Sequence, residues 1–143
     1  MYQIKLGELS DILAIEPHIP EFNRAKNMHQ ITERLGNKPY LLLIAYHEKT
    51  PVGYKLGYAL NDNTFYSWLG AVLPDHRGKG LAQKMLMRQE TWLQQNGYNK
   101  VQVKTMNCFR AMLAMLVKNN YFITGVEPNT NNALSKIHFE KVL

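Results

Sequence analysis

Large apolar residues alternate with small or polar ones in the first half of the chain and recur at helical spacing in the second half. The clearest alternation runs from 52 to 60, a period of two that is typical of a β-strand. The continuous apolar run at 40–46 is typical of a strand buried on both faces, and the polar turn between the two segments predicts a hairpin. Further strands are predicted at 2–6, 65–73, 101–105, 121–126 and 137–142.

Four helices are predicted between these strands. Apolar residues at helical spacing predict helices over 81–97 and 112–117. Ser10 is a plausible N-cap for a helix through Glu16, and Pro20 suits the first turn of a helix over 21–35. The order predicts an α/β (α+β) fold in which a mixed sheet is flanked by helices. A length of 143 residues suits one domain over 1–143.

The sharpest chemical signal is the segment from 72 to 82, where a strand ends at Pro74, a glycine-rich turn follows and a long amphipathic helix begins. The first N–H groups of a helix lack internal partners and carry partial positive charge. Glycines in the turn would let a phosphate approach the backbone, and Arg77 and Lys79 would add charge. Simple turn chemistry remains the alternative, and neither the Walker nor the Rossmann pattern occurs.

The run Arg77-Gly78-Lys79-Gly80-Leu81-Ala82 resembles the Arg/Gln-x-x-Gly-x-Gly/Ala motif of the GNAT superfamily of N-acyltransferases. Segments 107–113 and 118–125 resemble the second block of that family, so the resemblance covers about Leu69 to Gly125. It implies a mixed, mostly antiparallel central sheet of about seven strands flanked by about four helices. It also implies an acetyl-CoA-dependent N-acetyltransferase whose primary amine acceptor attacks directly in a ternary complex.

The resemblance also implies which residues bind acetyl-CoA. A bulge in the fourth strand would expose main-chain groups to the pantetheine arm, and the N–H of Val72 would polarise the thioester carbonyl. The pyrophosphate would rest on the turn, and Asn107 would contact the pantetheine or the acceptor. The expected binding residues are Ala71, Val72, Leu73, Arg77, Gly78, Lys79, Gly80, Leu81, Ala82 and Asn107. Because no protein nucleophile is needed, Cys108 is expected to be a packing residue.

The sequence departs from the family pattern at the catalytic acid. Many members place a tyrosine in the second-block helix, and that position here holds Leu116. The catalytic residues are therefore unknown, with Tyr66 and Tyr121 as candidates. The missing tyrosine keeps open a non-catalytic acyl-CoA-binding regulatory domain of the same fold.

The residues that accept the amine and its proton are also open. Glu16, His18 and Glu21 lie near the first helices, where the family often builds its acceptor pocket, and they are not ranked. Arg24 and Arg34 could meet an acidic acceptor or lie on a solvated helix face.

Composition narrows the partners. A formal charge of +6 favours anionic partners, but no aromatic-basic RNA motif or helix-turn-helix spacing suggests nucleic acid. The five histidines lack paired ligand spacing, so no metal is expected. With one cysteine, no secretory signal and no apolar run of bilayer length, we expect a cytoplasmic protein without a membrane segment. A homodimer is possible, because the late strands often pair subunits in the family.

Overall fold

The protein is described from a computed structural model that covers residues 1–21 and 26–143. Its helices are α1 (Leu9–Ile15), α2 (Met28–Leu35), α3 (Leu81–Gln95) and α4 (Arg110–Lys118). Its strands are β1 (Tyr2–Leu6), β2 (Tyr40–His47), β3 (Thr50–Ala59), β4 (Thr64–Val72), β5 (Lys100–Met106), β6 (Phe122–Glu127) and β7 (Lys136–Val142). Short 3₁₀ turns lie at Glu16–His18, Pro74–His76 and Asn132–Leu134.

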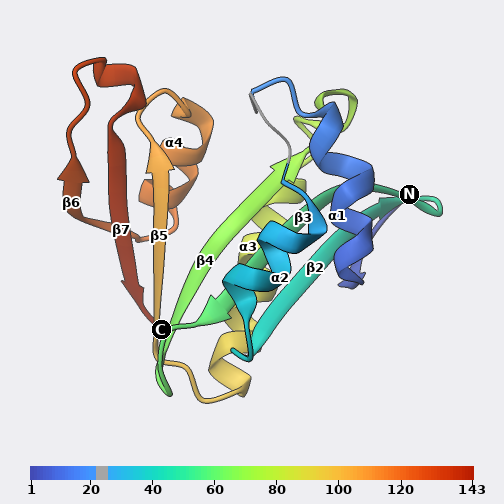
Figure 1. The fold of residues 1–143 in the computed structure, drawn as a ribbon, viewed down its shortest axis with the longest axis horizontal. Coiled ribbons are helices and arrows are strands. Elements are labelled where there is room, and N and C mark those ends of the chain that lie inside the picture. The colour runs from blue at the N-terminus through green and yellow to red at the C-terminus, as the bar shows by residue number, and fades with distance from the viewer. Residues whose placement is uncertain (22–25) are drawn as a thin grey trace.

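The strands form one seven-stranded sheet in the order β1-β2-β3-β4-β5-β7-β6. Neighbouring strands are antiparallel except for β4 and β5, which are parallel. In Figure 1, α1 and α2 cover one face of β2, β3 and β4, and α3 lies behind the same strands. The predicted fold class, a mixed and mostly antiparallel sheet with four helices, is therefore confirmed.

The core has one layer on each face of the sheet. Tyr54 and Tyr58 of β3 are buried under α1 and α2, at 0% and 5% exposure, as the alternation of this strand predicts. On the opposite face, a Cβ atom at Gly53 would lie 3.5 Å from Met85 of α3. A Cβ atom at Gly57 would lie 3.2 Å from Gln89 of the same helix. These two glycines of β3 therefore allow α3 to pack closely against this face of the sheet.

Two helix starts differ from the prediction. The helix predicted from Glu21 begins at Met28, where Asn27 and Gln30 exchange side-chain and main-chain hydrogen bonds of 2.8 and 2.9 Å. Residues 22–25 of the predicted helix lie outside the described residues, and Glu21 lies in a turn. Ser10 is not a cap, because α1 begins at Leu9 and its N-terminus is closed by the side chain of Asp11, which accepts from the Glu8 N–H at 3.0 Å.

Candidate functional site

A bulge interrupts β4 at Trp68. Leu56 of β3 pairs with Leu69, but the next residue, Gly57, pairs with Ser67, so Trp68 is an extra residue in β4. The parallel pairing of β4 with β5 also ends at Ser67, opposite Val103. The two strands then diverge (Figure 1), so β4 continues to Val72 with a partner on only one side. Bulges commonly end pairing in this way.

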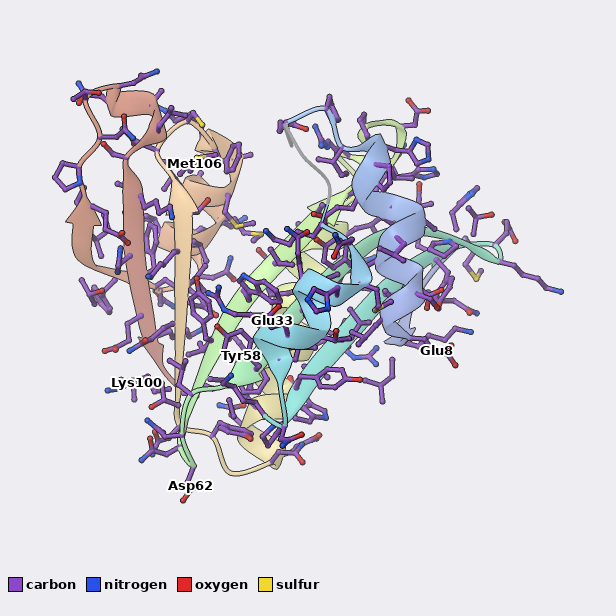
Figure 2. All side chains as sticks on the ribbon, viewed as in Figure 1. Glu8, Glu33, Tyr58, Asp62, Lys100 and Met106 are labelled. Carbon is purple, nitrogen blue, oxygen red and sulfur yellow. The ribbon has the colours of Figure 1, made fainter. Side chains whose placement is uncertain are left out.

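The same divergence is visible along β5. Figure 2 labels both ends of this strand. Lys100 lies where β5 still pairs with β4, and Met106 lies where β5 pairs only with β7.

Register decides which main-chain groups of β4 are open. The N–H of Leu73 donates to the carbonyl of Val52 at 2.8 Å. Bonded and non-bonded pairs alternate along antiparallel strands, so Leu69, Ala71 and Leu73 direct their main-chain groups to β3. Gly70 and Val72 direct theirs to the side from which β5 has diverged. Of the three residues at the end of β4 that were predicted to meet the pantetheine arm, only Val72 presents an open N–H. Gly70, which also presents one, was not predicted.

The glycine-rich turn after β4 has the geometry of an anion site. Gly78 and Gly80 have φ angles of +75° and +78°, which side chains rarely adopt. A Cβ atom at either glycine would meet no heavy atom within 4 Å, so the turn borders open space. The first bond of α3 runs from the Lys84 N–H to the Gly80 carbonyl at 3.0 Å. Within the described chain, the N–H groups of residues 78–83 have no acceptor, because no side chain caps this helix.

Arg77 is not simply a free cation beside this turn. Its guanidinium group binds both carboxylate oxygens of Glu21 at 2.6 and 2.9 Å, and its Nε donates to the Val72 carbonyl at 2.9 Å. The hydrogen bond from Arg77 lowers the pKa of Glu21. Arg77 therefore ties the end of β4 to the segment before α2. Lys79, which is exposed, remains as the cation on the turn.

Asn107 and Cys108 lie just beyond β5. The Asn107 main chain donates to the Ser135 carbonyl at 2.8 Å, and its side chain donates to the Asn132 carbonyl at 3.2 Å. Asn107 thus holds the turn that leads into β7. Cys108 is exposed, so the expectation that it packs in the interior is wrong.

The two tyrosine candidates lie in different surroundings. Tyr121 is 3% exposed and donates its O–H to Glu90 at 2.8 Å; burial and the Glu90 charge raise its pKa. Its proton is therefore held in the core. Tyr66 is half-buried on the face covered by α1 and α2, edge-on to Tyr58, and burial raises its pKa. Leu116, at the family's tyrosine position, is fully buried among apolar residues.

Aromatic and cationic side chains gather beside the bulge on the same face as Tyr66. The Arg34 guanidinium group lies 5.0 Å from the ring centre of Trp68, and its Nε donates to the Tyr58 hydroxyl at 2.9 Å. The Lys26 ammonium group lies 5.9 Å from the Trp68 ring. Arg34 is thus packed against the sheet rather than only solvated. Arg24, named with it in the sequence analysis, lies outside the described residues.

The three unranked polar candidates can now be distinguished. Glu16 is 2% exposed; it accepts a hydrogen bond from the Tyr54 hydroxyl and a longer one, 3.4 Å, from the Lys26 N–H. Glu21 is held by Arg77, and His18 is exposed. Glu16 and Glu21 therefore have protein partners.

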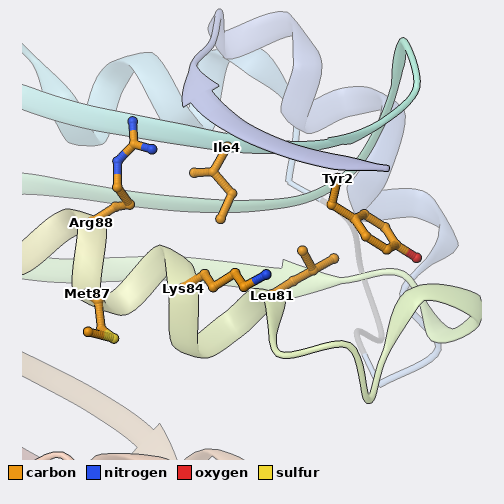
Figure 3. Close-up of a pocket in the computed structure, with 6 residues that line it drawn as sticks. All are labelled: Tyr2, Ile4, Leu81, Lys84, Met87 and Arg88. Atoms are coloured by element: carbon orange, nitrogen blue, oxygen red, sulfur yellow. The ribbon is translucent and has the colours of Figure 1, made fainter.

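A separate cavity of about 370 Å³ lies between edge strand β1 and the outer side of α3 (Figure 3). Its lining residues are Tyr2, Ile4, Leu81, Lys84, Met87 and Arg88. It shares only Leu81 with the predicted site. In residues 1–21 and 26–143, no three His, Cys, Asp or Glu side chains are grouped to hold a metal ion. No helix in the same residues is long and apolar enough to cross a bilayer.

Comparison with known proteins gives a consistent picture. Residues 7–121 match the family model described as the Acetyltransferase (GNAT) family. No protein of curated function matches the chain.

Among solved structures, the chain is similar to the ribosomal-protein-S18-alanine N-acetyltransferase of Escherichia coli, with a TM-score of 0.85 and 17% identity over 99% of this chain and 94% of that one. It is also similar to Ard1 from Thermoplasma volcanium, with a TM-score of 0.85 and 13% identity over 99% and 97% of the two chains. A GNAT family acetyltransferase from Elizabethkingia anophelis with acetyl-CoA bound has a TM-score of 0.76 and 16% identity over 99% and 98%. At these identities the similarity shows the fold.

Proposed function

Because the chain belongs to the GNAT acetyltransferase family, we propose that it transfers an acetyl group from acetyl-CoA to a primary amine. One observation carries the proposal. An uncapped helix N-terminus with two positive-φ glycines directly follows a strand whose edge is open at Gly70 and Val72. The first feature suits a diphosphate and the second an extended chain with amide and thioester groups. One ligand that carries both, in this order, is an acyl-coenzyme A.

In the proposed complex, the pyrophosphate accepts hydrogen bonds from the N–H groups of residues 78–82. The pantetheine arm lies along the open edge of β4. The N–H of Gly70 or Val72 donates to the thioester oxygen and stabilises the charge that develops there during attack. The Val72 carbonyl already accepts a hydrogen bond from Arg77, which holds the main chain of Val72 in position.

The acceptor amine attacks the thioester carbon directly, without a covalent protein intermediate. It would approach from the face that carries Tyr66, Trp68 and Arg34. Arg34 keeps its terminal guanidinium nitrogens without hydrogen-bond partners among the described residues, so we expect acceptors with an acidic group near the amine to be preferred. Cytoplasmic location and a homodimer stay predictions. The apolar residues exposed on edge strand β6, Phe122, Ile123 and Val126, would suit a subunit contact.

A panel of primary amines with detection of the released coenzyme A thiol tests this function. The panel should pair each amine that carries a carboxylate with a matched neutral amine. We expect acetyl-CoA-dependent thiol release with at least one class of amine.

The alternative is a non-catalytic acyl-CoA-binding regulatory domain, which the buried Leu116 at the family's tyrosine position favours. Saturable acetyl-CoA binding without thiol release across the panel would support that alternative. Absence of binding would contradict both functions.

A further inference from the structure

Lys55 is a lysine in the middle of a central strand, with 7% of its surface exposed. Its neighbours two residues away on either side, Gly53 and Gly57, face Met85 and Gln89 of α3. Side chains two apart share a face of a strand, so Lys55 also points to the α3 face. Within the described chain, its ammonium group has neither a hydrogen-bond acceptor nor a paired carboxylate. A lysine that exposes so little of its surface and has no paired carboxylate calls for an explanation.

Lys55 lies directly beside the proposed thioester site. It is the register partner of Gly70, the open-edged residue next to the bulge. Because Gly70 has no side chain, nothing on β4 separates the Lys55 stem from that edge: a Cβ atom at Gly70 would lie 3.9 Å from Cγ of Lys55. The glycine therefore leaves the lysine a path along the sheet toward the point where β4 and β5 separate.

A second polar group on this face also lacks a partner. Gln89 of α3 is fully buried, and neither its oxygen nor its nitrogen has a hydrogen-bond partner in the described part of the chain. It lies under Gly57, which follows Lys55 by two residues and is on the same face of β3. Buried amides in proteins are almost always satisfied. A fully buried amide without a partner, next to a largely buried lysine without a paired carboxylate, therefore indicates a polar group that reaches this point from outside the chain.

The proposed reaction needs a group of this kind. When the C–S bond breaks, the sulfur leaves with the electron pair and must take a proton. Leu116 has no proton to give, and the Tyr121 proton is bound to Glu90. We propose that the ammonium group of Lys55 donates a proton to the coenzyme A sulfur as the thioester C–S bond breaks. This inference rests on the proposed acetyl transfer.

The step balances without another reactant. The amine nitrogen forms the C–N bond, the C–S bond breaks, and a proton moves from Lys55 Nζ to sulfur to give the free thiol. Lys55 is then a neutral amine. It regains a proton from solvent, which also takes the proton lost by the product nitrogen.

The charge surroundings suit such a transfer. Burial lowers the pKa of Lys55 to about 8, and among the described residues the charge that opposes this effect is that of Glu90 on α3. Glu90 is itself bound to Tyr121 and to the Lys141 ammonium group, at 2.8 and 2.7 Å. A thiol has a pKa of about 8.5, so donor and acceptor are closely matched, which favours proton transfer.

The test measures the thiol of bound coenzyme A, so it needs no acceptor. The pKa of that thiol is obtained from the ultraviolet absorbance of the thiolate, as the difference between complexes with coenzyme A and with desulfo-coenzyme A. The difference cancels the contribution of Cys108. We expect the bound thiol in the wild type to have a pKa about one unit or more below that of free coenzyme A, because a nearby cation stabilises the thiolate. In Lys55→Met this lowering should disappear. In Lys84→Met, which removes an exposed lysine on the outer side of α3, it should persist.

Turnover gives the second readout. With an acceptor from the amine panel, Lys55→Met should lower kcat about 100-fold while acetyl-CoA affinity changes by less than about threefold. Coenzyme A that binds to the wild type with an unshifted thiol pKa would overturn the role of Lys55 and leave the proposed function standing. This holds even if Lys55→Met fails to fold. A wild type that does not bind coenzyme A would overturn the proposed function, and the role of Lys55 with it.

Discussion

Two ionisable side chains are buried on opposite faces of β3: one has hydrogen-bond partners within the fold, and the other has none among the described residues. On the α1 face, the Glu16 carboxyl group is 2% exposed, and it accepts hydrogen bonds from the Tyr54 hydroxyl and the Lys26 main chain. On the α3 face, Lys55 is 7% exposed and has no partner in the described residues. A buried group that the fold itself satisfies is explained by structure. A buried group that the fold leaves unsatisfied points to a ligand, and Lys55 lies beside the strand edge at which we place the thioester.

The largest loss of stability is expected when the buried Glu16 carboxyl group loses a hydrogen-bond partner. Tyr54→Phe removes the O–H that donates to Glu16 and leaves a buried carboxyl group with one long hydrogen bond. We expect the free energy of unfolding to fall by about 3 kcal/mol. Chemical denaturation measures this loss. A loss below about 0.5 kcal/mol would mean that the Glu16 bond is not structural.

Replacing Lys55 should have the opposite effect and raise the free energy of unfolding. The pKa of Lys55 is about 8 in the folded protein and 10.5 when unperturbed, so the unfolded chain binds more protons between these values. The cost of burying the charge is therefore full below about pH 8 and fades as the pH rises toward 10.5. Lys55→Met should stabilise the protein by about 2 kcal/mol at pH 7, with the gain shrinking above pH 8.

Denaturation of Lys55→Met and the wild type at several pH values checks this prediction. A destabilised Lys55→Met, or a gain that does not depend on pH, would show that Lys55 has a partner that compensates its burial.

The glycine-rich turn allows a test in which only charge differs. Gly80 has a φ of +78°, so any substitution there strains the backbone, but Asn and Asp tolerate this region best and have the same shape. We expect Gly80→Asp to bind acetyl-CoA at least about tenfold more weakly than Gly80→Asn, because its carboxylate would repel the pyrophosphate. Calorimetric titration of the two folded variants measures the ratio. Equal affinities would mean that the pyrophosphate does not bind at this turn.

The smallest effect on stability is expected at the ion pair between Arg77 and Glu21. Their side chains are 40% and 41% exposed. Solvent therefore screens the pair, and Glu21→Gln should cost less than about 1 kcal/mol. Thermal unfolding measures this cost, and a larger loss would mean that the segment before α2 depends on this contact for its position.

Sequence patterns were sufficient for the architecture and for the turn at 77–82, because both depend on local periodicity and on glycines with positive φ. They did not identify which residues of β4 have open main-chain groups. That depends on the extra residue Trp68, which shifts the alternation so that Gly70 and Val72 face the open edge. Nor could they show that Arg77 binds Glu21, since the two residues are 56 positions apart in sequence.

Lys55 illustrates the same limit. In the sequence it occupies one of the small or polar positions of an alternating strand, where an exposed lysine would be ordinary. Only the packing of α3 against Gly53 and Gly57, and the register of Lys55 with Gly70, show that it is buried beside an open strand edge. The helix predicted from Glu21 begins later, at Met28, because local sequence offers two possible starts. Proline followed by an acidic residue suits a helix start, but the Asn27–Gln30 cap lies closer to the apolar stripe.

Titration of the protein with acetyl-CoA, followed through the main-chain amide signals in NMR spectra, tests the central claim most directly. The account predicts saturable changes at the amides of Gly70, Val72 and residues 78–82, with little change at the Leu73 amide, which is bonded to Val52. No change at millimolar acetyl-CoA, or saturable changes confined to the cavity between β1 and α3, would contradict it.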